Sequence, residues 1–229
     1  MINRELFITR LSAWAPGVEN PGEWDEWAQG IRQISSGTKG PQISFADPML
    51  RRRMSQISKM TVQVIHDLMP LKEGTKVFFV SFRGEISRHF QLNKMLIEEK
   101  SLMPAAFSLS VFNAPVALAS ITLGLRGGYT ALYPTENNPF ATCLAAAKAA
   151  LLGSTAEEIA FVYADEEAPP EYGTELSLPT AFGLVLSEHQ QCESPCSFPV
   201  PLSSVEGGED APLDFLRRIL LCGKIHVSA

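Results

Sequence analysis

Residues 113–153 read NAPVALASITLGLRGGYTALYPTENNPFATCLAAAKAALLG, and this stretch decides the fold. Its last part predicts a helix, because Pro139 suits the first turn of a helix and Asn138 is a good N-cap. Gly153 stands where a glycine commonly ends a helix. Between these signals, the apolar residues fall on one stripe: Phe140, Cys143, Leu144, Ala147 and Leu151. We therefore expect an amphipathic helix over residues 139–152.

The residues before this helix predict a strand and a sharp turn. Residues 127–133, GGYTALY, are typical of a strand, and residues 134–138, PTENN, lie where the chain must turn into the helix. A side chain in such a turn lies at the positive end of the helix dipole, where a thiolate is stabilised. Acyl-transfer enzymes place a cysteine at such an elbow, but this turn carries Glu136.

The rest of the chain predicts an α/β fold. Residues 76–82, 158–164 and 181–186 are short apolar runs, typical of strands buried on both faces. Residues 7–9 open a first strand, and helical spacing is found over several longer segments: 49–69, 86–100 and 212–221. Buried strands that alternate with helices indicate helices layered around a mixed, mainly parallel sheet. Residues 1–187 then form one domain, and the loop-rich residues 188–229 form a C-terminal arm that packs on it.

Composition narrows the function classes. The chain has 229 residues, is 45% apolar and has a formal net charge of −6, which argues against nucleic acid as a partner. No apolar run reaches a membrane span, and residues 1–10 lack the pattern of a signal peptide. The four cysteines form neither a disulfide framework nor a convincing metal site, although Cys192 and Cys196 stand close in sequence. We expect a cytoplasmic protein with no cofactor and no metal.

The opening stretch resembles the nucleophile segment of β-ketoacyl synthases, condensing enzymes of the thiolase fold. These enzymes carry an asparagine, a Gly-Leu-Arg/Lys-Gly motif, a strand, a Thr-Ala-Cys elbow and a helix that ends in glycine. Here Asn113, residues 124–127 and residues 129–133 match that order without a gap up to Gly153. The register puts Glu136 at the position of the nucleophilic cysteine. Further similarity extends the match to roughly residues 45–187, the N-terminal half of a synthase, and includes short proteins of aryl polyene gene clusters.

The resemblance implies an auxiliary subunit. Without the cysteine, and without the C-terminal half that carries the catalytic histidines, the chain is expected to be catalytically incompetent alone. It would be a chain-length-factor-like subunit that pairs with a catalytic ketosynthase, meets the acyl carrier protein indirectly and shapes the acyl tunnel in polyene or fatty-acid-like biosynthesis. The residues that the resemblance implies at the interface or tunnel are Phe112, Asn113, Tyr129, Leu132, Tyr133, Glu136 and Phe140.

Several alternatives remain open at the level of sequence. Glu136 is either a vestige at a lost active site or a group that acts across the dimer interface. Cys143 is a substitute nucleophile if the chain is an independent acyltransferase or thioesterase, although its place on the apolar stripe favours a buried, inert thiol. The cluster Arg51, Arg52 and Arg53 is either a solvated helix face or a docking site for an acidic carrier protein. Residues 165–167, DEE, are expected to form a solvated loop after a strand.

Overall fold

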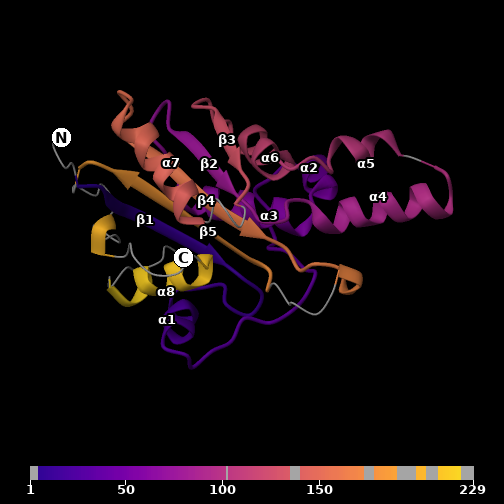
Figure 1. Ribbon diagram of the computed structural model, residues 1–229, viewed down its shortest axis with the longest axis horizontal. Helices are drawn as coiled ribbons and strands as arrows, with labels where there is room; N and C mark the ends of the chain where they lie inside the picture. The colour runs from indigo at the N-terminus through magenta and orange to yellow at the C-terminus, as the bar shows by residue number, and fades with distance from the viewer. Residues whose placement is uncertain are drawn as a thin grey trace.

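The computed structural model describes residues 5–101, 103–134, 140–172, 178–189, 200–204 and 211–222. Within these residues, the chain forms one six-stranded sheet with the strand order β3-β2-β4-β5-β1-β6 (Figure 1). The strands are β1 (Phe7–Trp14), β2 (Lys76–Val80), β3 (Tyr129–Leu132), β4 (Glu158–Asp165), β5 (Thr180–Ser187) and β6 (Val200–Pro201). The predicted α/β fold with a mixed sheet is confirmed.

The directions of the strands follow from their pairing. β2 lies between β3 and β4 and is parallel to both, whereas β5 is antiparallel to its neighbours β4 and β1, and β6 is antiparallel to β1. The strands β1, β2, β3 and β4 therefore point the same way, and β5 and β6 run against them. In β4 and β5 every residue is buried, as expected for strands covered on both faces.

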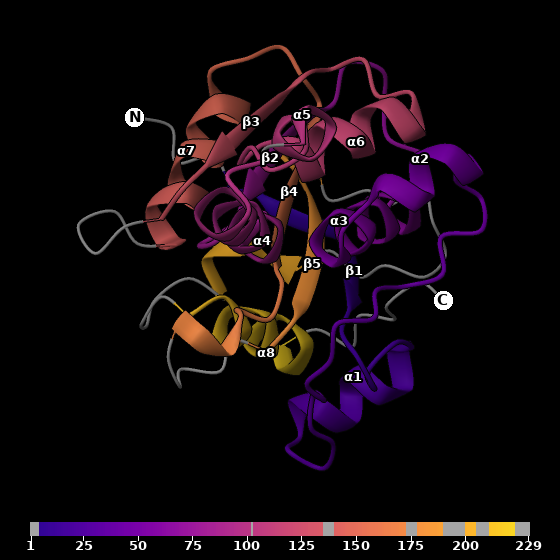
Figure 2. The same cartoon turned by 90° about the vertical axis from the view of Figure 1, so that its right-hand side faces the viewer.

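Helices cover both faces of the sheet. The side chains of β4 point alternately to the two faces and show which helices cover each one. Ile159, Phe161 and Tyr163 join a core cluster with α7 (Phe140–Leu152), α1 (Pro21–Ala28) and α8 (Pro212–Cys222). The alternate residues of β4 join a second cluster with α3 (Gln56–Asp67) and α6 (Ala114–Leu123) on the other face. The result is a three-layer arrangement in which the C-terminal α8 contributes to one layer (Figure 2).

One part of the chain projects from this body. The helices α4 (Ile86–Glu98) and α5 (Pro104–Ser108) lie side by side and extend away from the sheet at the right of Figure 1. We call these two helices the arm, a name that from here on does not refer to residues 188–229. Leu92 is the only fully buried residue of α4, all of which the structure describes, so apolar packing anchors this helix weakly.

The predicted single helix over residues 49–69 is wrong in one respect, because the chain breaks it in two. α2 (Pro48–Arg53) ends at Met54, whose backbone is extended, and Ser55 then caps α3 by accepting a hydrogen bond from the Ser58 N–H. A serine that caps a new helix competes with continuation of the old one.

The expected last helix is present as α8, preceded by β6 and the short helix η2 (Leu202–Ser204); another short helix, η1 (Pro170–Tyr172), follows β4. Among the described residues, no helix is long and apolar enough to cross a membrane.

Candidate functional site

The parallel strands β3, β2 and β4 end at the same edge of the sheet, where the chain passes through residues 81–85, 133–134 and 165–167. The carboxyl ends of parallel strands are the usual place for a site in such sheets. The predicted elbow begins here, immediately after β3. Residues 135–139, which include Glu136, Asn138 and Pro139, lie outside the described residues.

Phe112 stands at the centre of this edge. Its ring lies 6.2 Å from that of Phe79 on β2 and 5.8 Å from that of Tyr133. A side chain at Gly84 would come within 2.8 Å of the Phe112 ring, so the loop after β2 closes directly over it. Beside it, the Asn113 side-chain amide donates a hydrogen bond of 3.0 Å to the Tyr129 hydroxyl. Four of the residues singled out from the sequence, Phe112, Asn113, Tyr129 and Tyr133, are thus brought together.

Leu132 and Phe140 lie apart from this group, on the α7 face of the sheet. Leu132 is partly buried against the core. Phe140 is only 2% exposed, and its ring contacts four aromatic rings of the core: Phe161, Tyr163, Phe182 and Phe215. In the isolated chain, Phe140 is therefore a core residue, and a role for it in a tunnel remains a prediction.

Cys143 is also buried, at 2% exposure on α7, and burial raises the pKa of its thiol. A reactive cysteine needs an accessible thiolate with a lowered pKa. The burial of Cys143 and the raised pKa of its thiol therefore argue against this residue as a substitute nucleophile. Cys192 and Cys196 fall outside the described residues, and within the described part of the chain no cluster of His, Cys, Asp or Glu could hold a metal ion.

The acidic run at the end of β4 is not the solvated loop that the sequence suggested. Asp165 and Glu166 are both buried. Asp165 accepts hydrogen bonds from the Ser81 hydroxyl at 2.6 Å and from the backbone N–H groups of Phe82 and Arg83 at 3.0 Å each. It also accepts one from the Tyr163 hydroxyl, and burial together with the Asp165 carboxylate raises the pKa of Tyr163. Asp165 thus fixes the loop that follows β2.

Glu166 and Glu85 are two buried acids beside the first turn of α4, where the arm begins. Glu166 accepts a hydrogen bond of 3.0 Å from the backbone N–H of Ser87. Glu85 accepts hydrogen bonds from the hydroxyls of Ser55 and Ser58 and an ion-paired one from Arg88. The sequence hinted at these partners only by placing serines at the starts of α3 and α4. Loop composition alone suggested solvent exposure, because burial of these acids depends on helices distant in sequence.

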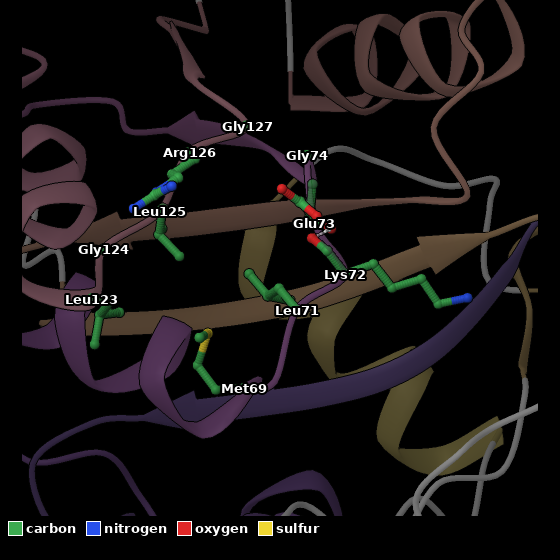
Figure 3. Close-up of a pocket in the computed structure, with 11 residues that line it drawn as sticks. Met69, Leu71, Lys72, Glu73, Gly74, Leu123, Gly124, Leu125, Arg126 and Gly127 are labelled. Atoms are coloured by element: carbon green, nitrogen blue, oxygen red, sulfur yellow. Dashed lines mark hydrogen bonds between the residues drawn. The ribbon is translucent and has the colours of Figure 1, made fainter.

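The glycine-rich motif that carried the resemblance lies at the opposite, amino-terminal end of β2 and β3. With Met69, residues 71–75 and Leu123, it lines a small cavity of about 140 Å³ (Figure 3). Gly124 ends α6 with a φ of 65°, and a Cβ on Gly127 would lie 2.0 Å from the Thr75 carbonyl oxygen. The motif therefore serves a tight turn between α6 and β3, away from the predicted elbow.

The basic cluster is partly accessible. Arg52 and Arg53, in the last turn of α2, are exposed and Arg51 is half-buried. Arg88 donates a hydrogen bond to the Arg53 carbonyl oxygen, so a fourth arginine joins them. The cluster lies near the root of the arm.

Comparison with known proteins identifies the family of this chain. The family described as β-ketoacyl synthase, N-terminal domain, matches residues 24–210, well over half of the chain. The chain belongs to this family. A comparison with curated proteins gave no match.

Solved structures of synthases share the fold. The ketosynthase ApeO in complex with its chain length factor ApeC, from Xenorhabdus doucetiae, matches with 23% identity and a TM-score of 0.66, over 81% of this chain and 79% of that one. The ishigamide ketosynthase/chain length factor matches with 12% identity and a TM-score of 0.62, over 86% and 64%. The AntDE:AntF complex, a type II polyketide synthase acyl carrier protein with its ketosynthase, matches with 15% identity and a TM-score of 0.63, over 82% and 63%. At these identities the comparisons establish the thiolase-like fold, and the chain spans less than two thirds of the last two proteins.

Proposed function

We propose that this chain is a non-catalytic, chain-length-factor-like subunit that pairs with a catalytic β-ketoacyl-[acyl carrier protein] synthase and shapes its acyl tunnel. The observation that carries the proposal is Glu136 at the nucleophile position, in an ungapped register, four residues after β3, which is an edge strand of the sheet that the structure describes. A carboxylate cannot form the acyl thioester on which condensation depends. Chemistry would then have to come from the partner.

The edge strand β3 supports pairing with a partner. Within the described residues its one neighbour is β2, so its other side presents unpaired backbone groups. Open strand edges invite pairing with another chain. Tyr133, at the end of this strand, is 56% exposed, which is high for an aromatic side chain beside the core.

The arm supports the same proposal. The arm and the residues beside α5 expose apolar side chains that a free protein rarely displays together: Leu96, Ile97, Met103, Phe107 and Val111. Ile97 is 77% exposed and Phe107 is 59% exposed. Because the chain runs from the arm through Phe112 and α6 into β3, a partner that pairs with β3 would also meet apolar surface nearby. Aromatic and apolar side chains of this kind form the centres of stable interfaces.

The acyl tunnel would pass the group around Phe112. Aromatic rings at the carboxyl edge of the sheet form an apolar wall, and a bulky side chain in such a wall limits the length of the chain that fits. The substrates would be acyl groups on a carrier protein, in the synthesis of a polyene or a fatty-acid-like product. An aryl polyene pigment is the first candidate, and the cytoplasm is the expected location.

The test is co-expression with a catalytic ketosynthase encoded beside this chain, followed by size-exclusion chromatography and a condensation assay. The proposal expects a 1:1 complex that extends acyl carriers only when both chains are present. A stable monomer, beside a ketosynthase that works equally well alone, would refute it.

Direct carrier docking on this chain is the alternative to an indirect contact through the catalytic partner. The basic cluster is the candidate contact for an acidic carrier protein. Replacing Arg52 and Arg53 by glutamate is expected to weaken carrier binding to the complex, measured by calorimetry at low salt, and to leave heterodimerisation intact. Unchanged carrier binding would assign docking to the catalytic subunit alone.

A further inference from the structure

The arm joins the body through polar contacts. Its first residues follow the loop that Asp165 holds, and within α4 only Leu92 is fully buried. The arm's position therefore depends on what binds its first turn. Two buried carboxylates do this, Glu85 and Glu166.

The two carboxylates each connect α4 with α3. Glu166, at the end of β4, accepts the Ser87 N–H in the first turn of α4, and its other oxygen lies 3.5 Å from the Ile57 N–H in the first turn of α3. Glu85, the residue that precedes α4, accepts the Ser55 and Ser58 hydroxyls at 2.7 and 2.6 Å. Each carboxylate thus lies at helix N-termini, where negative charge is stabilised.

The charges around Glu166 oppose its ionisation. Its pKa is raised to about 7, chiefly by burial and also by the like charge of Glu85, while the hydrogen bond from the Ser87 N–H acts in the opposite direction. Arg88 lies against Glu85, at 3.2 Å. Of the neighbouring acids, Asp165 binds the loop after β2 and Glu167 accepts a hydrogen bond from the Gly37 N–H. The first turns of α3 and α4 carry no acidic residue.

We propose that Glu85 and Glu166 form a latch that holds the arm in position for partner binding and releases it as the pH rises. When the arm opens, Glu166 becomes solvated and its pKa returns toward 4.5, so the closed arm binds an additional proton between about pH 4.5 and 7. Closure is then favoured at low pH. Between pH 6 and 8 the equilibrium constant for opening is expected to rise about tenfold. The latch is a property of the isolated chain, and only its effect on partner binding rests on the function proposed above.

Hydrogen–deuterium exchange of the isolated chain tests the latch. Protection factors of arm peptides, corrected for intrinsic exchange, are compared between wild type and Glu166→Gln from pH 6 to 8, and arm protection below that of α7 shows that the arm opens locally. The wild-type arm is expected to lose about tenfold in protection relative to the Glu166→Gln arm. Glu166→Gln should abolish this dependence, whereas Glu98→Gln, which removes an exposed carboxylate from the same arm, should retain it.

The outcomes separate the latch from a purely structural role. Glu85→Gln removes a like charge and should shift the profile to lower pH, so it decides the question if Glu166→Gln does not fold. A wild-type arm whose corrected protection does not change between pH 6 and 8, an unaltered profile in Glu166→Gln, or an unshifted profile in Glu85→Gln would overturn the proposal.

Partner binding is measured with the same variants. Affinity for the catalytic ketosynthase is expected to fall by up to about tenfold from pH 6 to 8 for wild type and Glu98→Gln, and to stay constant for Glu166→Gln. A ketosynthase that binds at neither pH would contradict the proposed function and leave the exchange result standing. Binding without pH dependence, where exchange shows that a large fraction of the arm is open at pH 8, would overturn the role of the latch in partner binding.

Discussion

At the scale of the residue, Gly127 is the position, among the glycines that the structure describes, where a side chain is least tolerable. A Cβ there would lie 2.0 Å from the Thr75 carbonyl oxygen and 2.5 Å from that of Gly74, and backbone atoms cannot move as a flexible side chain can. We expect Gly127→Ala to lower the free energy of unfolding by about 2–3 kcal/mol, measured by urea denaturation.

The matched control for Gly127 is Gly22, inside α1. A Cβ there would meet only the Asn20 side chain at 3.6 Å. Gly22→Ala is expected to be neutral or to stabilise by up to about 1 kcal/mol, since alanine favours helix. Equal losses of unfolding free energy in the two variants would show that the close approach of Gly127 to the Thr75 carbonyl does not cause the destabilisation.

Cys143 and Cys222 provide a second comparison at this scale. The Cys143 thiol is buried with a raised pKa, whereas Cys222 is exposed at the end of α8. A mild thiol reagent should label Cys222 of the native protein rapidly and Cys143 only after denaturation. Peptide mapping by mass spectrometry gives the measurement. Rapid labelling of native Cys143 would revive the hypothesis of an independent acyltransferase or thioesterase.

Glu166 also predicts how the stability of the whole chain depends on pH. Its folded pKa, about 7, exceeds the ordinary value of 4.5, so the folded state binds the additional proton. Its contribution is fully present below pH 4.5 and is lost as the pH rises through 7, by up to about 3 kcal/mol. The unfolding free energy of wild type minus that of Glu166→Gln, measured from pH 5 to 8, should therefore decrease as the pH rises. A difference that does not change with pH would contradict it.

At the scale of the element, β3 allows a test of strand pairing. The Val77 N–H donates to the Gly128 carbonyl and the Ser81 N–H to that of Leu132, so alternate residues of β3 bond to β2. The backbone N–H of Ala131 then points to the open edge. Ala131→Pro should leave the fold intact, because proline is tolerated at a strand edge, and weaken heterodimerisation by about tenfold or more.

Thr130→Pro is the control for the edge strand, because it removes an N–H that faces β2. It should destabilise the isolated chain, seen as a lower thermal midpoint, which Ala131→Pro should not. Heterodimers of Ala131→Pro with unchanged affinity would exclude strand pairing along β3.

The elements also show what the sequence could and could not predict. Runs of apolar β-branched and aromatic residues predicted β2, β4 and β5 well, because burial on both faces leaves a local pattern. The break at Ser55 was missed because the apolar spacing continues across it, and only the cap reveals it. The burial of Asp165 and Glu166 was missed for a different reason: their partners come from α3 and the loop after β2, far away in sequence.

At the scale of the whole molecule, the chain completes its own layers. α1 and α8 pack against each other on the same face as α7, and a cation–π contact of 4.6 Å joins Arg217 to Trp27. The sheet faces are thus covered, while the edge strand and the arm keep exposed apolar and backbone groups. This distribution of covered faces and exposed edge is what a subunit needs if it is to fold by itself and then pair.

Under the proposed function, the length of the product is a property of the whole complex. If Phe112 forms part of the wall of the partner's tunnel, Phe112→Ala removes an aromatic ring from that wall, and the products of the complex should become longer, measured by mass spectrometry. Phe45→Ala is the control, because its ring stacks on His66, outside the arm. Phe140→Ala does not test the tunnel, since loss of this core ring should destabilise the chain by about 3–5 kcal/mol. Products of unchanged length from an intact Phe112→Ala complex would remove Phe112 from the tunnel wall.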